Sequence, residues 1–164
     1  MGLTQSVVPN HPELYYCCRY ERDYKKAIDI VSSNPDDATY RDFNSETILH
    51  HLASQSNPPL DTIKVILEAY PGALNSENKN GRTPLHIASY CSSPDVVAYF
   101  VTESPITAKA RDSDGLTPLD LAIIFHRKDN AEEIISACAV HDMSISDICT
   151  ANSDRNLDSE LRTQ

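Results

Sequence analysis

Apolar residues recur at intervals of three and four positions in four well-separated stretches of the chain. The positions that form these stripes are Ala27, Ile30 and Val31; Ile63, Ile66 and Leu67; Val97, Phe100 and Val101; and Ala131, Ile134 and Ile135. This spacing puts each stripe on one face of a helix. Burial of one such side chain contributes roughly 1.5 to 3 kcal/mol. We therefore predict four helices whose striped faces form a core rather than a cofactor pocket.

A short pattern precedes each of the last three stripes. Residues 80–88 read Asn-Gly-Arg-Thr-Pro-Leu-His-Ile-Ala, and residues 114–122, which begin 34 positions later, read Asp-Gly-Leu-Thr-Pro-Leu-Asp-Leu-Ala. A degenerate copy, Thr-Ile-Leu-His at residues 47–50, lies 36 positions before the matching residues 83–86. A fixed period of this length predicts a stacked array in which neighbouring units share one core.

Prolines mark the same period at the ends of the helices. Pro35, Pro71 and Pro105 each follow an apolar stripe, and proline stops a helix from continuing. Apolar residues follow these prolines at a constant offset of three: Ala38, Leu74 and Ala108. Together the two periodic signals predict four helix pairs, the first of which lacks its own hairpin.

The Thr-Pro steps and the turns before them have a direct physical interpretation. Thr83 and Thr117 are predicted N-caps, because a hydroxyl accepts a hydrogen bond from a free amide of the first helical turn while proline supplies a helical φ. Asn-Gly at residues 80–81 and Asp-Gly at 114–115 favour the positive φ angles of tight primed turns. Each unit is therefore expected to begin with a short hairpin that projects from the helices.

A Gly-containing turn, Thr-Pro-Leu-His, a short helix, a longer helix and an extended loop together resemble the ankyrin repeat. The resemblance covers about residues 12–140. It implies an all-α, ankyrin-type helical solenoid of about four helix pairs with short hairpin fingers, and a non-catalytic protein-protein interaction module or adaptor. In this family the motif histidine, here His50 and His86, stabilises the loop through local hydrogen bonds. The departures from the pattern are Ile48 for Pro, Leu52 for Ala, Asp120 for His and Ser45 for the turn Gly.

The resemblance also places partner contacts on the hairpin tips and on the exposed side of the first helices. The matching positions are Phe43, Asn44, Glu46, Lys79, Asn80, Arg82, Tyr90, Cys91, Ser113, Asp114, Leu116, Ile124 and Phe125. For any single polar hairpin residue, a solvated turn is the competing interpretation. We rank Tyr90 and Phe125 first, because aromatic side chains dominate binding hot spots.

The array is expected to occupy residues 12–140. Residues 1–11 are interpreted as a flexible leader, and residues 141–164 as a polar, partly disordered tail. Within that tail, Met143, Ile145 and Ile148 form the last apolar cluster, which we expect to cap the stack.

Composition excludes several classes of function. The 164 residues include 24 acidic and 14 basic ones, a formal net charge of −10, so nucleic acid is not an expected partner. The four glycines form neither a phosphate-binding loop nor a nucleophile elbow. We predict a protein that is not an enzyme, needs no cofactor, and binds an unidentified protein as a monomer.

Five cysteines indicate free thiols in a reducing compartment, which favours a cytoplasmic location and leaves a nuclear or peripheral membrane location open. A zinc site built from Cys138, His141 and Cys149 lacks a fourth ligand, so no metal site is predicted. The pair His50-His51 is interpreted as the motif histidine followed by an ordinary helix residue.

Two alternatives to the adaptor remain open. The first six residues fit the myristoylation pattern at Gly2, which would make the protein a peripheral membrane adaptor, although one acyl chain alone binds membranes only marginally. The other alternative is a thiol-based sensor or a regulatory enzyme subunit that uses Cys91 or the adjacent Cys17 and Cys18.

Overall fold

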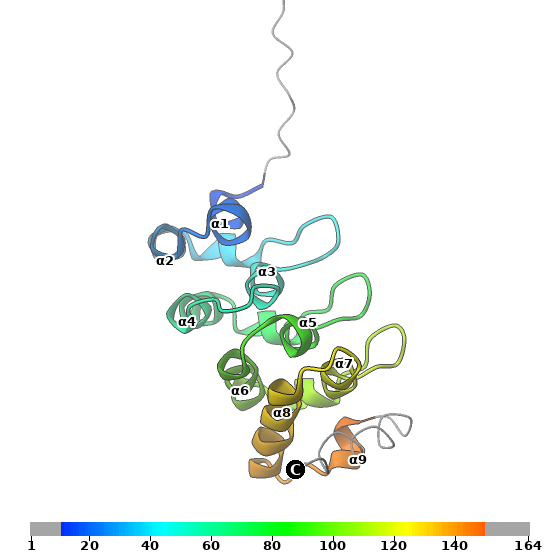
Figure 1. Ribbon diagram of the computed structural model, residues 1–164. Helices are drawn as coiled ribbons and strands as arrows, with labels where there is room; N and C mark the ends of the chain where they lie inside the picture. Colours follow the sequence, from blue (N-terminus) through cyan, green and yellow to red (C-terminus); the bar gives the residue numbers. More distant parts are fainter. Residues whose placement is uncertain (1–10, 150–164) are drawn as a thin grey trace, which may run out of the picture.

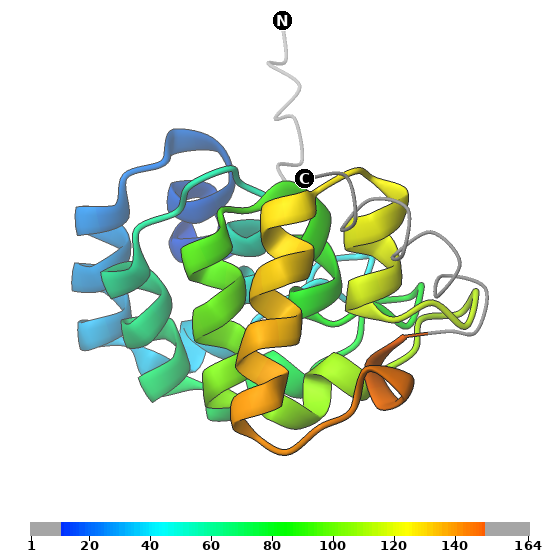
Figure 2. The ribbon, with the colours of Figure 1, turned by 60° about the horizontal axis from the view of Figure 1, so that its bottom comes forward.

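The computed structural model describes residues 11–149, which form a stack of helix pairs (Figure 1). The inner helices are α1 (Glu13–Tyr16) with the π-helical turn η1 (Cys17–Glu21), α3 (Ile48–Ala53), α5 (Pro84–Cys91) and α7 (Pro118–Ile124). The outer helices are α2 (Tyr24–Ser33), α4 (Leu60–Ala69), α6 (Pro94–Glu103) and α8 (Lys128–Val140). Figure 2 shows the outer helices side by side as one layer. The predicted all-α solenoid of about four helix pairs is confirmed.

The apolar stripes lie in the core that neighbouring pairs share. Ile63, Ile66, Phe100 and Ile134 are fully buried or nearly so. Inner helices pack on inner helices, α3 on α5 and α5 on α7, and the outer layer packs α2 on α4 and α6 on α8. No pair buries its apolar face alone, as the period of the sequence predicts.

The inner helices α3 and α5 each begin with a cap that also ties the helix to the next unit. Nδ1 of His50 accepts a hydrogen bond from the Thr47 amide at 3.1 Å, while its Nε2 donates to the Arg82 carbonyl at 2.9 Å. His86 repeats both contacts with Thr83 and Leu116. Burial lowers the pKa of His50 to about 4, so the ring is neutral at physiological pH, with its proton on Nε2. The motif histidines therefore stabilise the hairpin that follows them as well as their own helix.

The segment after each proline is a 3₁₀ helix, where the family resemblance implied an extended loop. These elements are η2 (Pro35–Thr39), η3 (Pro71–Asn75) and η4 (Pro105–Lys109). Proline provides a helical φ at the first position of each, and the short i to i+3 hydrogen bonds continue for one turn. The buried Ala38, Leu74 and Ala108 thereby reach the core.

The last element of the described residues packs at the C-terminal end of the stack. Helix α9 (Ile145–Ile148) packs against η4, and its Ile148 is buried. The Ile148 carbonyl accepts a hydrogen bond from the Thr117 hydroxyl at 2.7 Å. Ile145, which we expected in the same cap, is exposed. The predicted leader and most of the predicted tail lie outside the described residues, and the boundaries at residues 11 and 140 stay predictions.

Candidate functional site: the hairpin fingers and the inner face

Three hairpin turns, which we call the fingers, project from the same side of the stack (Figure 1). They comprise residues 42–46, 78–82 and 112–116. Each begins with Asp or Asn, and the side-chain Oδ1 accepts hydrogen bonds from two backbone amides. In the third finger, Asp112 accepts from Asp114 and Leu116, both at 3.0 Å. This period of Asp42, Asn78 and Asp112 is visible in the sequence and was missed there.

The fingers are not the primed turns that the Asn-Gly and Asp-Gly steps predicted. A primed type I turn needs positive φ at both central residues. Gly81 and Gly115 have φ of 70° and 78°, but neither Asn80 nor Asp114 has a positive φ. The Asp or Asn that starts the turn holds the amides of the residues after it, and this favours a turn with a single left-handed residue. In the first finger Ser45 takes that place, with φ 63°.

Hydrogen bonds join each finger to the next. The amides of Lys79 and Ser113 donate to the carbonyls of Asn44 and Asn80, each at 2.9 Å. Side chains add a second connection between the fingers. Glu46 Oε1 accepts a hydrogen bond from Asn78, and Arg82 Nε donates one to Asp112. These two distances are 3.2 and 3.0 Å. The fingers thus form a cross-linked ladder, whose shape is held without a partner.

The inner face, the exposed side of α3, α5 and α7 beside the fingers, carries an aromatic pair. The rings of Tyr90 and Phe125 stack with centroids 4.8 Å apart and an interplanar angle of 25°. The Arg82 guanidinium lies 6.0 Å from the centroid of the Tyr90 ring. Phe125 is 52% exposed and the adjacent Ile124 is 50% exposed. The structure therefore brings together the two residues that we ranked first and joins them to a finger.

The other predicted contact residues differ in how much surface they offer. Exposed side chains on the fingers are those of Phe43, Asn44, Lys79, Asn80, Ser113 and Asp114. Partly buried ones are those of Glu46, Arg82, Leu116 and Cys91. Glu46 and Arg82 already form hydrogen bonds within the ladder, so these two side chains would have a structural role as well as any role in partner contact.

Four of the five cysteines lack the features of reactive thiols. Burial raises the pKa of Cys91 and of Cys17, and raises that of Cys18 to about 12. The thiolate is the nucleophile, so these thiols are poor nucleophiles at neutral pH. Burial likewise raises the pKa of Cys138 to about 11.

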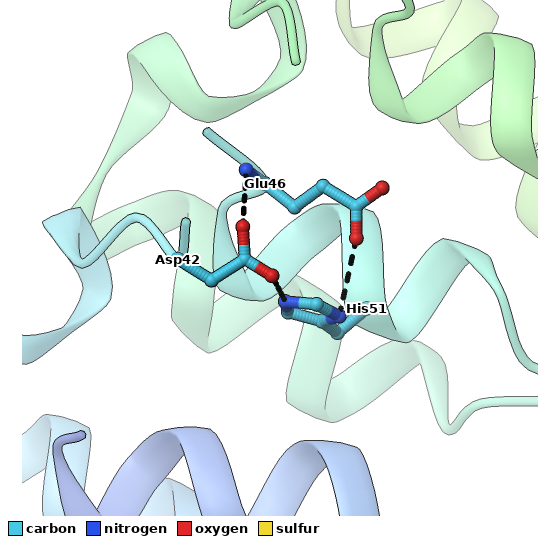
Figure 3. Close-up of side chains that lie close together, drawn as sticks. All are labelled: Asp42, Glu46 and His51. Carbon is cyan, nitrogen blue, oxygen red and sulfur yellow. Dashed lines mark hydrogen bonds and ion pairs between the residues drawn. The ribbon is translucent and has the colours of Figure 1, made fainter. Parts of the chain in front are cut away.

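A second cluster of polar groups lies at the base of the first finger. His51 of α3 faces the carboxylates of Asp42 and Glu46 (Figure 3). Its Nε2 lies 3.3 Å from Asp42 Oδ2, and its Nδ1 lies 3.6 Å from Glu46 Oε2. Among residues 11–149 this is the one group of three or more His, Cys, Asp and Glu side chains close enough to share an ion. Cys138, His141 and Cys149 form no such group.

The signal for this cluster was present in the sequence, although we interpreted His51 as an ordinary helix residue. One unit later its position is occupied by Ile87, and two units later by Leu121, both buried. A histidine in a register that is otherwise apolar stands out only once the repeats are aligned. Its partners come from a finger, so their approach depends on the fold.

The fold and the ladder of fingers define a helical repeat array of the kind that presents a surface to proteins. Residues 66–122 match the model of the family described as ankyrin repeats (many copies), so this part of the chain consists of ankyrin repeats and the resemblance is confirmed. The family is generally non-enzymatic, and its repeats typically bind partner proteins.

Curated relatives carry similar segments within much longer chains. Human Rabankyrin-5 is 30% identical over 92 residues, which are 56% of this chain and 8% of the relative. Human neurogenic locus notch homolog protein 4 is 36% identical over 94 residues, which are 57% of this chain and 4% of the relative. The match thus spans a small part of each relative.

Among solved structures, one chain matches with a TM-score of 0.63 and 20% identity, over 75% of this chain and 62% of that chain. It belongs to the structure titled as the Bd0816 predatory endopeptidase from Bdellovibrio bacteriovorus in complex with immunity protein Bd3460. At this identity the likeness shows the fold alone. Within residues 11–149, no helix combines the length and the apolar composition that a bilayer crossing requires.

Proposed function

We propose that the protein is a non-catalytic adaptor that binds a partner protein through the fingers and the inner face. The observation that carries this proposal is the stack of the exposed Phe125 ring on the partly buried Tyr90 ring, beside Arg82. Tyr, Trp and Arg are the side chains most enriched at binding hot spots. Phe125 is 52% exposed, so its ring is available for contact with a partner.

The ladder of fingers supports the same proposal through the entropy of binding. Ordering loops and side chains on association costs free energy, about 0.5–1.5 kcal/mol for each immobilised side chain. The backbone bonds between fingers and the pair of Arg82 with Asp112 already fix much of this surface. A partner would therefore meet a preformed surface.

The remaining aspects of the proposal follow from composition. We propose a cytoplasmic monomer that binds no nucleic acid and uses no cofactor for this interaction. The membrane alternative depends on Gly2, which lies outside the described residues. Intact mass after coexpression with an N-myristoyltransferase decides it, since acylation adds one myristoyl group.

The test compares the proteins that copurify with the wild type and with Tyr90→Ala/Phe125→Ala. The matched control is Ile106→Ala/Val140→Ala, because these two side chains are exposed apolar residues on η4 and α8, away from the inner face. We expect the inner-face variant to lose partners that the control retains. Thermal unfolding verifies that both variants are folded. If the inner-face variant keeps the same partners at the same yield, the proposed surface is wrong.

A further inference from the structure

The group of Asp42, Glu46 and His51 places a buried imidazole against two carboxylates. His51 is only 2% exposed, yet neither ring nitrogen makes a hydrogen bond of normal geometry. Each nitrogen instead has a carboxylate oxygen nearby, at 3.3 Å from Nε2 and 3.6 Å from Nδ1. A buried polar group without a satisfied partner is costly, so these atoms call for an explanation.

In each carboxylate, one oxygen accepts hydrogen bonds that fix the side chain, and the second oxygen points at the His51 ring (Figure 3). Asp42 Oδ1 accepts the amides of Asn44 and Glu46 at 2.8 and 2.9 Å, which leaves Oδ2 for His51. Glu46 Oε1 accepts from the Asn78 amide group at 3.2 Å, which leaves Oε2. Hydrogen bonds of this kind orient metal-binding carboxylates in known sites. The Tyr15 ring, 5.0 Å from the His51 ring and nearly perpendicular to it, packs on the imidazole.

The charges of the cluster are not balanced by a neighbouring side chain. Among residues 11–149, neither Asp42 nor Glu46 forms an ion pair with a lysine or an arginine, and the charge of Arg19 acts only at longer range. Two acidic side chains therefore face one buried imidazole with no lysine or arginine paired to them, and a divalent cation would compensate their charge.

We propose that His51, Asp42 and Glu46 bind a divalent transition-metal ion, with Zn²⁺ as the fitting example. One imidazole nitrogen and two carboxylate oxygens form a mixed set that suits zinc better than Mg²⁺ or Ca²⁺, which prefer oxygen alone. Donor atoms bound to one tetrahedral zinc at about 2.0 Å lie about 3.3 Å apart. Nε2 and Asp42 Oδ2 already have this separation of 3.3 Å.

The third ligand requires a side-chain rotation, because Glu46 Oε2 lies beside Nδ1, whereas an ion held by Nε2 and Asp42 needs this oxygen on the Nε2 side of the ring. One donor atom from each residue lies within 4.8 Å of the other two, and Glu46 has the longest side chain of the three and is 24% exposed, so it has room to approach. A bound ion would fix the first finger to α3. The site would thus reinforce the one finger whose left-handed position is occupied by Ser45 rather than glycine.

The test is calorimetric titration of the purified, chelator-treated full chain with Zn²⁺. We expect one ion per chain, and an affinity at least tenfold weaker in Asp42→Asn. That variant preserves the turn, because Asn78 makes the same two amide contacts in the second finger. His51→Leu is expected to abolish binding, and Leu121 shows that leucine fits this register. Cys91→Ser, at the least buried cysteine, is the control and should bind as the wild type does.

Cobalt substitution identifies the donor atoms. Co²⁺ in the proposed site should give visible absorption without the near-ultraviolet charge-transfer band of a thiolate ligand. Absence of zinc binding at millimolar concentration, or equal binding by wild type and Asp42→Asn, would overturn the proposal, as would a thiolate band. If Asp42→Asn does not fold, Glu46→Gln, which retains an oxygen for Asn78, provides the same comparison.

Discussion

Gly81 stands where the second finger approaches the third, and its replacement by alanine tests how the fingers stack. Its φ is +70°, and a Cβ added there would lie 3.0 Å from the backbone nitrogen of Ser113. The left-handed conformation costs a residue with a Cβ about 1–2 kcal/mol. Forcing an extra carbon into a packed contact adds about 1–3 kcal/mol. Gly81→Ala is therefore expected to lower the free energy of unfolding by about 2–5 kcal/mol.

Gly115→Ala is the matched control for this prediction. Gly115 has φ +78°, but nothing lies within 4 Å of its added Cβ, because within residues 11–149 no further finger follows it. Only the conformational cost of about 1–2 kcal/mol remains, and the entropy that alanine removes from the unfolded chain is common to both variants. Urea unfolding measures the two losses. If they are equal, the fingers do not approach each other as described, and the ladder is refuted.

Three further predictions concern the interior of the array. Burial lowers the pKa of His86, so the folded state favours the neutral ring. The contribution of His86 to the free energy of unfolding is therefore complete above about pH 6.5 and declines as the pH falls. His86→Gln should flatten the pH dependence of the free energy of unfolding between about pH 7.5 and about pH 5.5. An unchanged slope would contradict this. Arg82→Met should cost about 1.5–3 kcal/mol in urea unfolding, because it leaves the buried Asp112 carboxylate without its charged donor; a loss below about 0.5 kcal/mol would show that the pair is not formed. In the folded protein a thiol reagent should modify Cys91 first, since the other four cysteines are buried, and rapid labelling of all five would argue against the packing.

The local features of the fold could be predicted because their causes are local. The Thr-Pro steps cap helices through residues three positions away, and Pro35, Pro71 and Pro105 end helices through their own backbone. The periodic spacing then implied the stack, because apolar faces of equal size recur at equal intervals. The 3₁₀ turns escaped prediction, since a proline ends one helix and permits another with equal ease.

Contacts between units were beyond the sequence pattern. His50 reaches the Arg82 carbonyl across 32 positions, and Glu46 reaches Asn78 across the same interval. Such bonds depend on the distance between neighbouring fingers, which no single repeat encodes. Tyr90 and Phe125 were singled out by their register, but their stacking follows from how α5 packs on α7. The cluster around His51 lies within one unit, and it was missed because His51 was not compared with the apolar residues at its position in the other repeats, Ile87 and Leu121.

Site-specific photocrosslinking in cells tests most directly whether the inner face binds a partner. A photoreactive phenylalanine derivative replaces Phe125 in one variant and Val140, which is 79% exposed on α8, in the other. The account predicts a discrete crosslinked protein from position 125 and none of comparable yield from position 140. Equal crosslinking at the two positions, or crosslinking at position 140 alone, would contradict it.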